Sequence, residues 1–316
     1  MISTLKAEFL KLVRPIFLIL TLAALALSFF MATMGQQTGA AQFKTAKDNL
    51  ALSLQRPTPC SFFGLKSGKR CDRARAQDLV DARNFVKQTI QDTRLGSASQ
   101  QPLGAAGFAA GVMSSVPGAF LILLLAAFSL GGEWSGRTMK IMLLQDGRRA
   151  RLLLAKLVVL WVASVWLLLW TIIGQIAYGQ LFRRVFVLPP PPGLHDIWAY
   201  AGPRLLHAPL ALLLFAALGL AMATLVRQPI GAFFGGALCL IVVNFLARFS
   251  GLHDWTPAGW LASWMHFKRE PLLFDHLWAD KMPSAGEPRA LLGLIALIAA
   301  LVTIAIVDIR RRDIQV

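Results

Sequence analysis

Six long apolar runs, separated by shorter and often basic connectors, constrain this chain more than any other feature. The runs are Pro15–Met34, Phe108–Leu130, Leu157–Tyr178, Leu205–Leu225, Ile230–Ala247 and Ala290–Val307. A helix rises about 1.5 Å per residue and the hydrocarbon core is about 30 Å thick, so about 20 apolar residues cross it. None of the runs has the alternating polarity of a membrane β-strand. We therefore predict an all-α integral membrane protein with six transmembrane helices.

The charged residues predict how this protein is oriented. Only 15% of the residues are charged, yet the net charge is +16. Lys and Arg are dense in short segments beside the apolar runs, which is the pattern that holds such segments in the cytoplasm. We expect both termini to be cytoplasmic, in the inner membrane of a bacterium. We expect the inner cations to meet anionic lipid headgroups of the bilayer rather than nucleic acid.

The runs and connectors divide the chain into membrane and surface segments. In order they are an amphipathic interfacial helix (1–14), transmembrane helix 1 (15–34), an outer loop or lobe (35–104), transmembrane helix 2 (105–130), a cytoplasmic connector (131–156), transmembrane helix 3 (157–178), an outer loop (179–204), transmembrane helix 4 (205–225), a cytoplasmic turn (226–229), transmembrane helix 5 (230–247), an outer segment with an interfacial helix (248–289), transmembrane helix 6 (290–307) and a cytoplasmic tail (308–316). Lys6, Lys11 and Arg14 also fit a signal peptide. The first run is longer than the 7–15 or so residues typical of one, so we expect an uncleaved anchor.

The outer segments carry weaker signals. In the lobe, Gln77–Leu95 has helical periodicity and precedes Gly96, a candidate C-cap. Thr256 followed by Pro257 starts a helix that lies in the outer interface or in an ordinary loop.

Cysteine and glycine positions add two further expectations. Cys60 and Cys71 both lie in the outer lobe, where an oxidising exterior favours a disulfide, although two independent thiols remain open. Gly107 with Gly111, and Gly231 with Gly235, have the spacing that lets helices approach closely, which is weak evidence for a dimer face.

The apolar runs hold few residues that could perform chemistry. Enzymes and ion-coupled carriers keep ionisable groups inside the bilayer, whereas these runs contain only His207 and Tyr178, near their ends. Gln175 and Asn244 are more simply interhelical hydrogen-bonding groups. Three His/Asp dipeptides lie on the outer side, at residues 195–196, 253–254 and 275–276. Adjacent residues make a poor chelate, so we expect neither a metal site nor catalysis. No phosphate-binding loop is present, so this chain does not itself cradle ATP.

The connector resembles that of permease subunits of type 2 ABC exporters. The matching positions are Gly132-Glu133, Thr138, Lys140–Leu144, Arg148-Arg149 and Ala155-Lys156, together with Glu8–Lys11 before the first run. Arg137 departs from the glycine that the family prefers, and Asp146-Gly147 replaces its usual proline turn. The motif-level resemblance covers about 25 residues, and the six-span layout also agrees.

The resemblance implies function by partnership. Such permeases form homodimers or heterodimers, and each copy docks a separate ABC ATPase subunit. The ATPase subunit holds the ATP and Mg²⁺, so the resemblance implies that this chain needs no cofactor of its own. The connector would be the coupling helix, with Glu133, Thr138, Met139 and Met142 at or near the ATPase contact. Glu133 could equally be an acidic residue that favours a helix N-terminus. The alternatives are a membrane sensor or immunity protein with a ligand-binding outer lobe, and a membrane enzyme. The substrate is not readable: drugs, lipids, peptides and polysaccharides all fit.

Overall fold

The described part of the chain is built from helices. A computed structural model describes residues 15–55, 59–63, 68–136, 149–186, 188–247, 255–267 and 287–311. Its helices are α2 (Pro15–Gln55), η1 (Cys60–Phe63), α3 (Lys69–Ala98), α4 (Pro102–Met113), α5 (Val116–Ala126), η2 (Ala127–Gly131), α6 (Gly132–Ser135), α8 (Arg149–Phe182), α9 (Leu194–Val226), α10 (Pro229–Leu246), α11 (Pro257–Trp264) and α12 (Glu287–Arg311). Six of these described segments are long and apolar enough to cross a membrane. The predicted all-α class, with six candidate membrane helices, is confirmed. The predicted interfacial helix at 1–14 and most of the tail lie outside the described residues.

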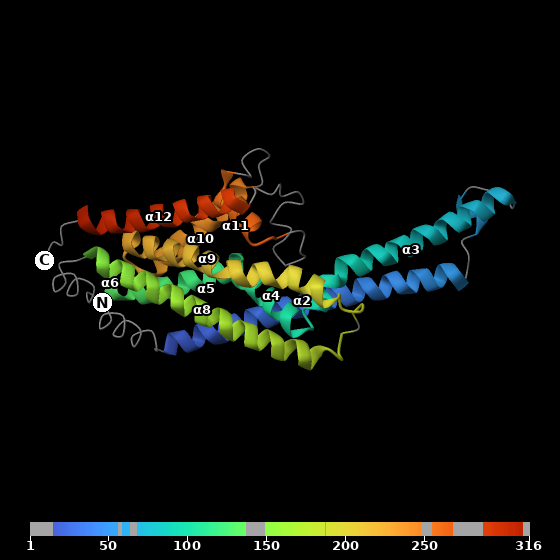
Figure 1. Ribbon diagram of the computed structural model, residues 1–316, viewed down its shortest axis with the longest axis horizontal. Helices are drawn as coiled ribbons and strands as arrows, with labels where there is room; N and C mark the ends of the chain where they lie inside the picture. Colours follow the sequence, from blue (N-terminus) through green and yellow to red (C-terminus); the bar gives the residue numbers. More distant parts are fainter. Residues whose placement is uncertain are drawn as a thin grey trace.

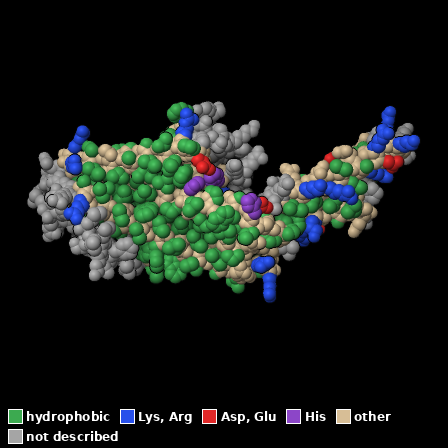
Figure 2. Space-filling model, in the orientation of Figure 1, with side chains coloured by type: hydrophobic (Ala, Val, Ile, Leu, Met, Phe, Trp, Pro, Cys, Tyr) green, Lys and Arg blue, Asp and Glu red, His purple; other side chains and the backbone are tan. Residues whose placement is uncertain are grey.

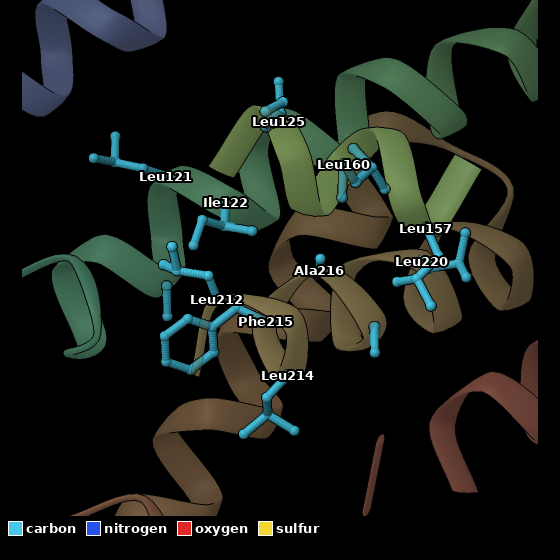
Figure 3. Close-up of a cluster of buried hydrophobic side chains, with 14 of the residues drawn as sticks. Leu121, Ile122, Leu125, Leu157, Leu160, Leu212, Leu214, Phe215, Ala216 and Leu220 are labelled. Carbon is cyan, nitrogen blue, oxygen red and sulfur yellow. The ribbon is translucent and has the colours of Figure 1, made fainter. Parts of the chain in front are cut away.

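The candidate spans pack into a bundle around α9 (Figure 1). Its neighbours include α4, α5, α8, α10 and α12. Figure 3 shows the centre of this packing, where leucine, isoleucine and phenylalanine side chains of α5, α8 and α9 fill the space between the helices. Phe215, Leu160 and Ile122 are among the fully buried side chains there. By contrast, most residues in the apolar stretches of α2, α10 and α12 are not buried within this chain, as expected for helices that face lipid.

The first candidate span continues far beyond the predicted membrane segment. The apolar run ends at Met34, but α2 continues unbroken to Gln55, giving 41 residues and a length of about 60 Å. The polar residues that follow Met34 end the hydrophobic run without ending the helix, because no proline interrupts them. The second half of α2 pairs with α3. Together they form a two-helix arm that projects from one end of the bundle (Figure 1).

The C-terminal end of α3 differs from the sequence prediction, and a disulfide lies at its N-terminal end. Gly96 is not a C-cap, because α3 passes through it to Ala98 and stops just before Pro102, the first residue of α4. At the far end, Cys60 and Cys71 form a disulfide, with their Cα atoms 5.5 Å apart. The bond therefore joins η1 to the first residues of α3.

The second predicted span is broken into several helices. Ser115 has extended backbone angles, with φ of −98° and ψ of 179°, and separates α4 from α5, which has Pro117 in its first turn. The Ser115 hydroxyl donates to the Val112 carbonyl at 2.6 Å. After α5 the chain passes through one π-helical segment, η2, into the short α6. A serine pair followed by proline stops a helix locally, whatever the hydropathy of the surrounding residues.

The paired glycines serve contacts within this chain. A Cβ on Gly107 would lie 2.6 Å from the Cβ of Ala201 in α9. A Cβ on Gly235 would lie 2.7 Å from the side chain of Met222, also in α9. The glycines let α4 and α10 approach α9 closely. Their spacing is therefore explained without a second copy of the protein.

Candidate functional site

The candidate site lies where α6 ends and α8 begins, on either side of the predicted coupling helix. Glu133 stands in the first turn of α6, and Lys156 lies in the second turn of α8. The Lys156 ammonium donates to a carboxylate oxygen of Glu133 at 2.5 Å. The side chain of Lys156 is 1% exposed and that of Glu133 is 11% exposed. An ammonium buried to this extent would be costly alone, so the carboxylate partner stabilises it.

A second set of contacts surrounds this pair. Trp134, next to Glu133, is buried, and the Arg227 guanidinium carbon lies 4.6 Å from the centre of its ring. Arg227 ends α9 in the left-handed conformation, with φ of 58°. Its guanidinium also lies 3.8 Å from a carboxylate oxygen of Asp308 near the end of α12. These contacts join the ends of α6, α9 and α12 at the opposite end of the bundle from the arm (Figure 1).

Close backbone packing also holds α6 in place. A Cβ on Gly131 would lie 2.8 Å from the Cα of Pro229, the first residue of α10. The end of η2 therefore rests directly on the turn between α9 and α10. The site is a closely packed junction of five helix ends, of which two, α6 and the start of α8, belong to the connector (131–156).

Some of the predicted site residues lie within the described part of the chain, and others lie outside it. Glu133 pairs with Lys156. It does not stand at a free helix N-terminus, because α6 continues from η2 through Gly131 and Gly132, which both have α-helical backbone angles. Its place at the ATPase contact stays a prediction. Thr138, Met139 and Met142 lie outside the described residues. The cysteine pair lies at the far end of the molecule, away from this junction.

A second polar cluster, where α9, α11 and α12 meet, is not indicated by the sequence. Arg204 in α9 is 2% exposed. Its guanidinium lies 4.1 Å from the Tyr200 ring and donates to the His266 carbonyl at 3.3 Å. His207 stacks on Trp264, with ring centres 3.9 Å apart. His266 in turn lies 3.0 Å from a carboxylate oxygen of Glu287.

This second cluster links α9, α11 and α12. The short helix α11 follows Thr256, whose side chain accepts from the Gly259 backbone N–H at 3.2 Å, as an N-cap does. The sequence signal for the cluster is Arg204, a cation directly before an apolar run. By itself that position is indistinguishable from an ordinary basic connector.

Hydrogen bonds between α2 and α8 account for the polar residues inside the spans. Gln175 donates to Ser28. The hydroxyls of Thr33 and Tyr178 lie 2.8 Å apart. The Asn244 side chain donates to its own helix, at Leu240. Gln175 is thus an interhelical group, as the sequence indicates, whereas the described partner of Asn244 is local.

The described residues contain no group of three or more His, Cys, Asp or Glu side chains able to hold a metal ion. The dipeptides at 253–254 and 275–276 lie outside the described residues.

Comparisons with protein-family models, curated proteins and solved structures gave no match for this chain. A function for this chain is therefore inferred from its residues and their geometry.

Proposed function

We propose that this chain is the membrane-spanning permease subunit of an ATP-driven ABC export system. In this proposal two permease subunits form the translocation path. A separate ATPase subunit binds ATP and Mg²⁺ and docks on the connector. The candidate spans, the basic connector and its resemblance to the family's connector support this function.

The buried Glu133–Lys156 pair is the observation that carries the proposal. It joins the two helices that lead into and out of the connector. A coupling helix must transmit a push from the ATPase to the spans, which requires that its two ends not move independently. An ion pair with a 1% exposed lysine holds those ends together within the bundle. A simple surface loop needs no such link.

The proposed chain of motion follows from the helices that meet at the junction. A displacement of the connector would move α6 and α8 together. Movement of α8 would reach α2 through the Gln175–Ser28 and Thr33–Tyr178 hydrogen bonds. Movement of α6 would reach α9 and α10 through Arg227 and the Gly131–Pro229 contact. The path between two such bundles could then open on one side or the other.

The test is assembly with an ABC ATPase encoded beside this chain. The two proteins are co-expressed, purified through a tag on this chain and assayed for ATP hydrolysis in lipid nanodiscs. We expect the ATPase to co-purify with the wild type. We expect Met139→Asp to reduce the amount recovered at least tenfold, because a charge in an apolar docking groove is desolvated without a partner. Arg183→Ala, an exposed change just beyond the far end of α8, is the matched control.

Two outcomes would contradict the proposal. The first is a wild-type chain that recovers no ATPase under conditions where the ATPase is folded. The second is a Met139→Asp variant that assembles and hydrolyses ATP like the wild type. The sensor alternative is favoured by one observation, the projecting arm, and predicts an outer ligand with no ATPase partner at all.

A further inference from the structure

One face of α3 carries a continuous line of exposed residues that has no partner in the bundle. Along α3, exposed side chains recur at alternating intervals of four and three residues, which places them on one line down the helix. They are Lys69, Arg73, Ala76, Val80, Arg83 and Lys87, all exposed. We call this line the basic face. It is about 27 Å long, at about 1.5 Å per residue.

The basic face carries four cations and has one acidic residue at its edge. Asp72, one turn from Lys69, lies beside the line, whereas Asp78 and Asp81 lie on other sides of the helix. Asp81 accepts a hydrogen bond from Gln77 at 3.0 Å on another side of the helix. Within the described part of the chain, no ion pair involves any of the four cations of the basic face. Their side chains are exposed to solvent. Figure 2 shows Lys and Arg side chains at several places along the arm.

The charge pattern of the basic face favours some classes of binding partner over others. Pairing of two copies through this same face is disfavoured, because it would place the same four cations opposite these four. A folded acidic protein would need an apolar or aromatic anchor in a pocket, and the line offers only Ala76 and Val80. A flexible linear polyanion needs no such anchor, since repeated ion contacts along its length supply the affinity.

We propose that the basic face of α3 binds a linear acidic polysaccharide on the side of the membrane opposite the connector. Lys69 and Arg73 form one cation pair and Arg83 and Lys87 a second, with the small side chains of Ala76 and Val80 between them. The planar guanidinium groups of the arginines can each hold a carboxylate or phosphate through two hydrogen bonds. This inference goes beyond the proposed function and does not require it, because the binding needs only the arm.

The test uses the full chain in nanodiscs made of zwitterionic lipid, so that anionic headgroups do not compete. The probe is fluorescent polygalacturonate, and binding is measured by anisotropy at several salt concentrations. The test variant replaces all four cations of the basic face, Lys69, Arg73, Arg83 and Lys87, by glutamine. The control variant removes the same number of charges elsewhere, at Lys44, Lys47, Arg183 and Arg184, all exposed and off the line.

We expect the test variant to bind polygalacturonate at least about tenfold more weakly, since each exposed ion contact changes affinity roughly two- to fivefold. We expect the control to change affinity less than about threefold. Val80→Glu, a single change at a side chain that is 46% exposed, should also weaken binding without unfolding the arm. Wild-type affinity should fall as salt is raised.

Several results would overturn the proposal. One is a wild-type chain that does not bind polygalacturonate at low salt. Another is a control variant that loses as much affinity as the test variant, which would reduce the effect to net charge. Tighter, basic-face-dependent binding of poly-L-glutamate would instead identify an unfolded acidic polypeptide as the partner. Circular dichroism of each variant confirms that the helices are intact.

Discussion

Removing the charge of Glu133 is the perturbation whose magnitude follows most directly from the structure. In Glu133→Ala the Lys156 ammonium stays buried, with a side chain only 1% exposed, and loses its carboxylate partner. Breaking a buried ion pair from one side costs about 3–5 kcal/mol. For a chain of this length that corresponds to a fall in the melting temperature of roughly 5–15 °C.

The reverse change should cost less. In Lys156→Met the remaining carboxylate is 11% exposed and can reach solvent or take up a proton, so we expect about half the loss of Glu133→Ala. The double variant Glu133→Leu with Lys156→Met leaves no buried charge. We expect it to lie within about 1 kcal/mol of the wild type, because well-packed apolar replacements of buried ion pairs are often neutral.

The assay is thermal unfolding in mild detergent, followed by tryptophan fluorescence. Trp134, one of nine tryptophans in the chain, is buried beside the pair and contributes part of this signal. The double-mutant cycle gives the coupling between the two residues. If the loss in the double variant equals the sum of the two single losses, the residues are not coupled. The reasoning that links the two ends of the connector would then be refuted.

Three further predictions concern other parts of the molecule. A cysteine introduced at Arg73 should react with an impermeant reagent from outside intact cells, and one at Arg148 should not; labelling at Arg148 would refute the proposed orientation. Alkylation before reduction should leave Cys60 and Cys71 unmodified, and replacing both by serine should make the arm more sensitive to trypsin while the bundle resists. Gly107→Leu should destabilise the fold by about 1–3 kcal/mol, since the facing α9 backbone leaves no room, whereas an unchanged melting temperature would show that the two helices are not tightly packed.

The number and approximate positions of the membrane helices could be predicted because hydropathy identifies the stretches of residues that are removed from water. The ends of the helices could not, because a helix stops for local reasons that hydropathy does not record. The apolar run ends at Met34, yet nothing there prevents α2 from continuing. Conversely, Ser114 and Ser115 interrupt an apolar stretch that otherwise satisfies every criterion for one span.

The sequence indicates residues of the junction but not the contact between them. Glu133 and Lys156 each stand out in the connector, but their contact spans 23 residues of sequence and depends on the packing that brings the start of α8 next to α6. The cluster where α9, α11 and α12 meet could not be predicted because Arg204 and His266 are far apart in the chain. Neither residue stands out alone, and only the packing of α11 against α9 and α12 brings them together.

Because α2 is unbroken, the direction of the arm reports the tilt of the first candidate span. From Met34 to Gln55 the helix extends beyond the apolar run by about 30 Å, so a tilt of about 10° would displace its end by about 5 Å. Such a displacement is within reach of a spin label or fluorophore placed near the disulfide at the end of the arm, outside the bilayer. Small rotations within the hydrocarbon layer would thus be magnified into distances that spectroscopy can resolve in water.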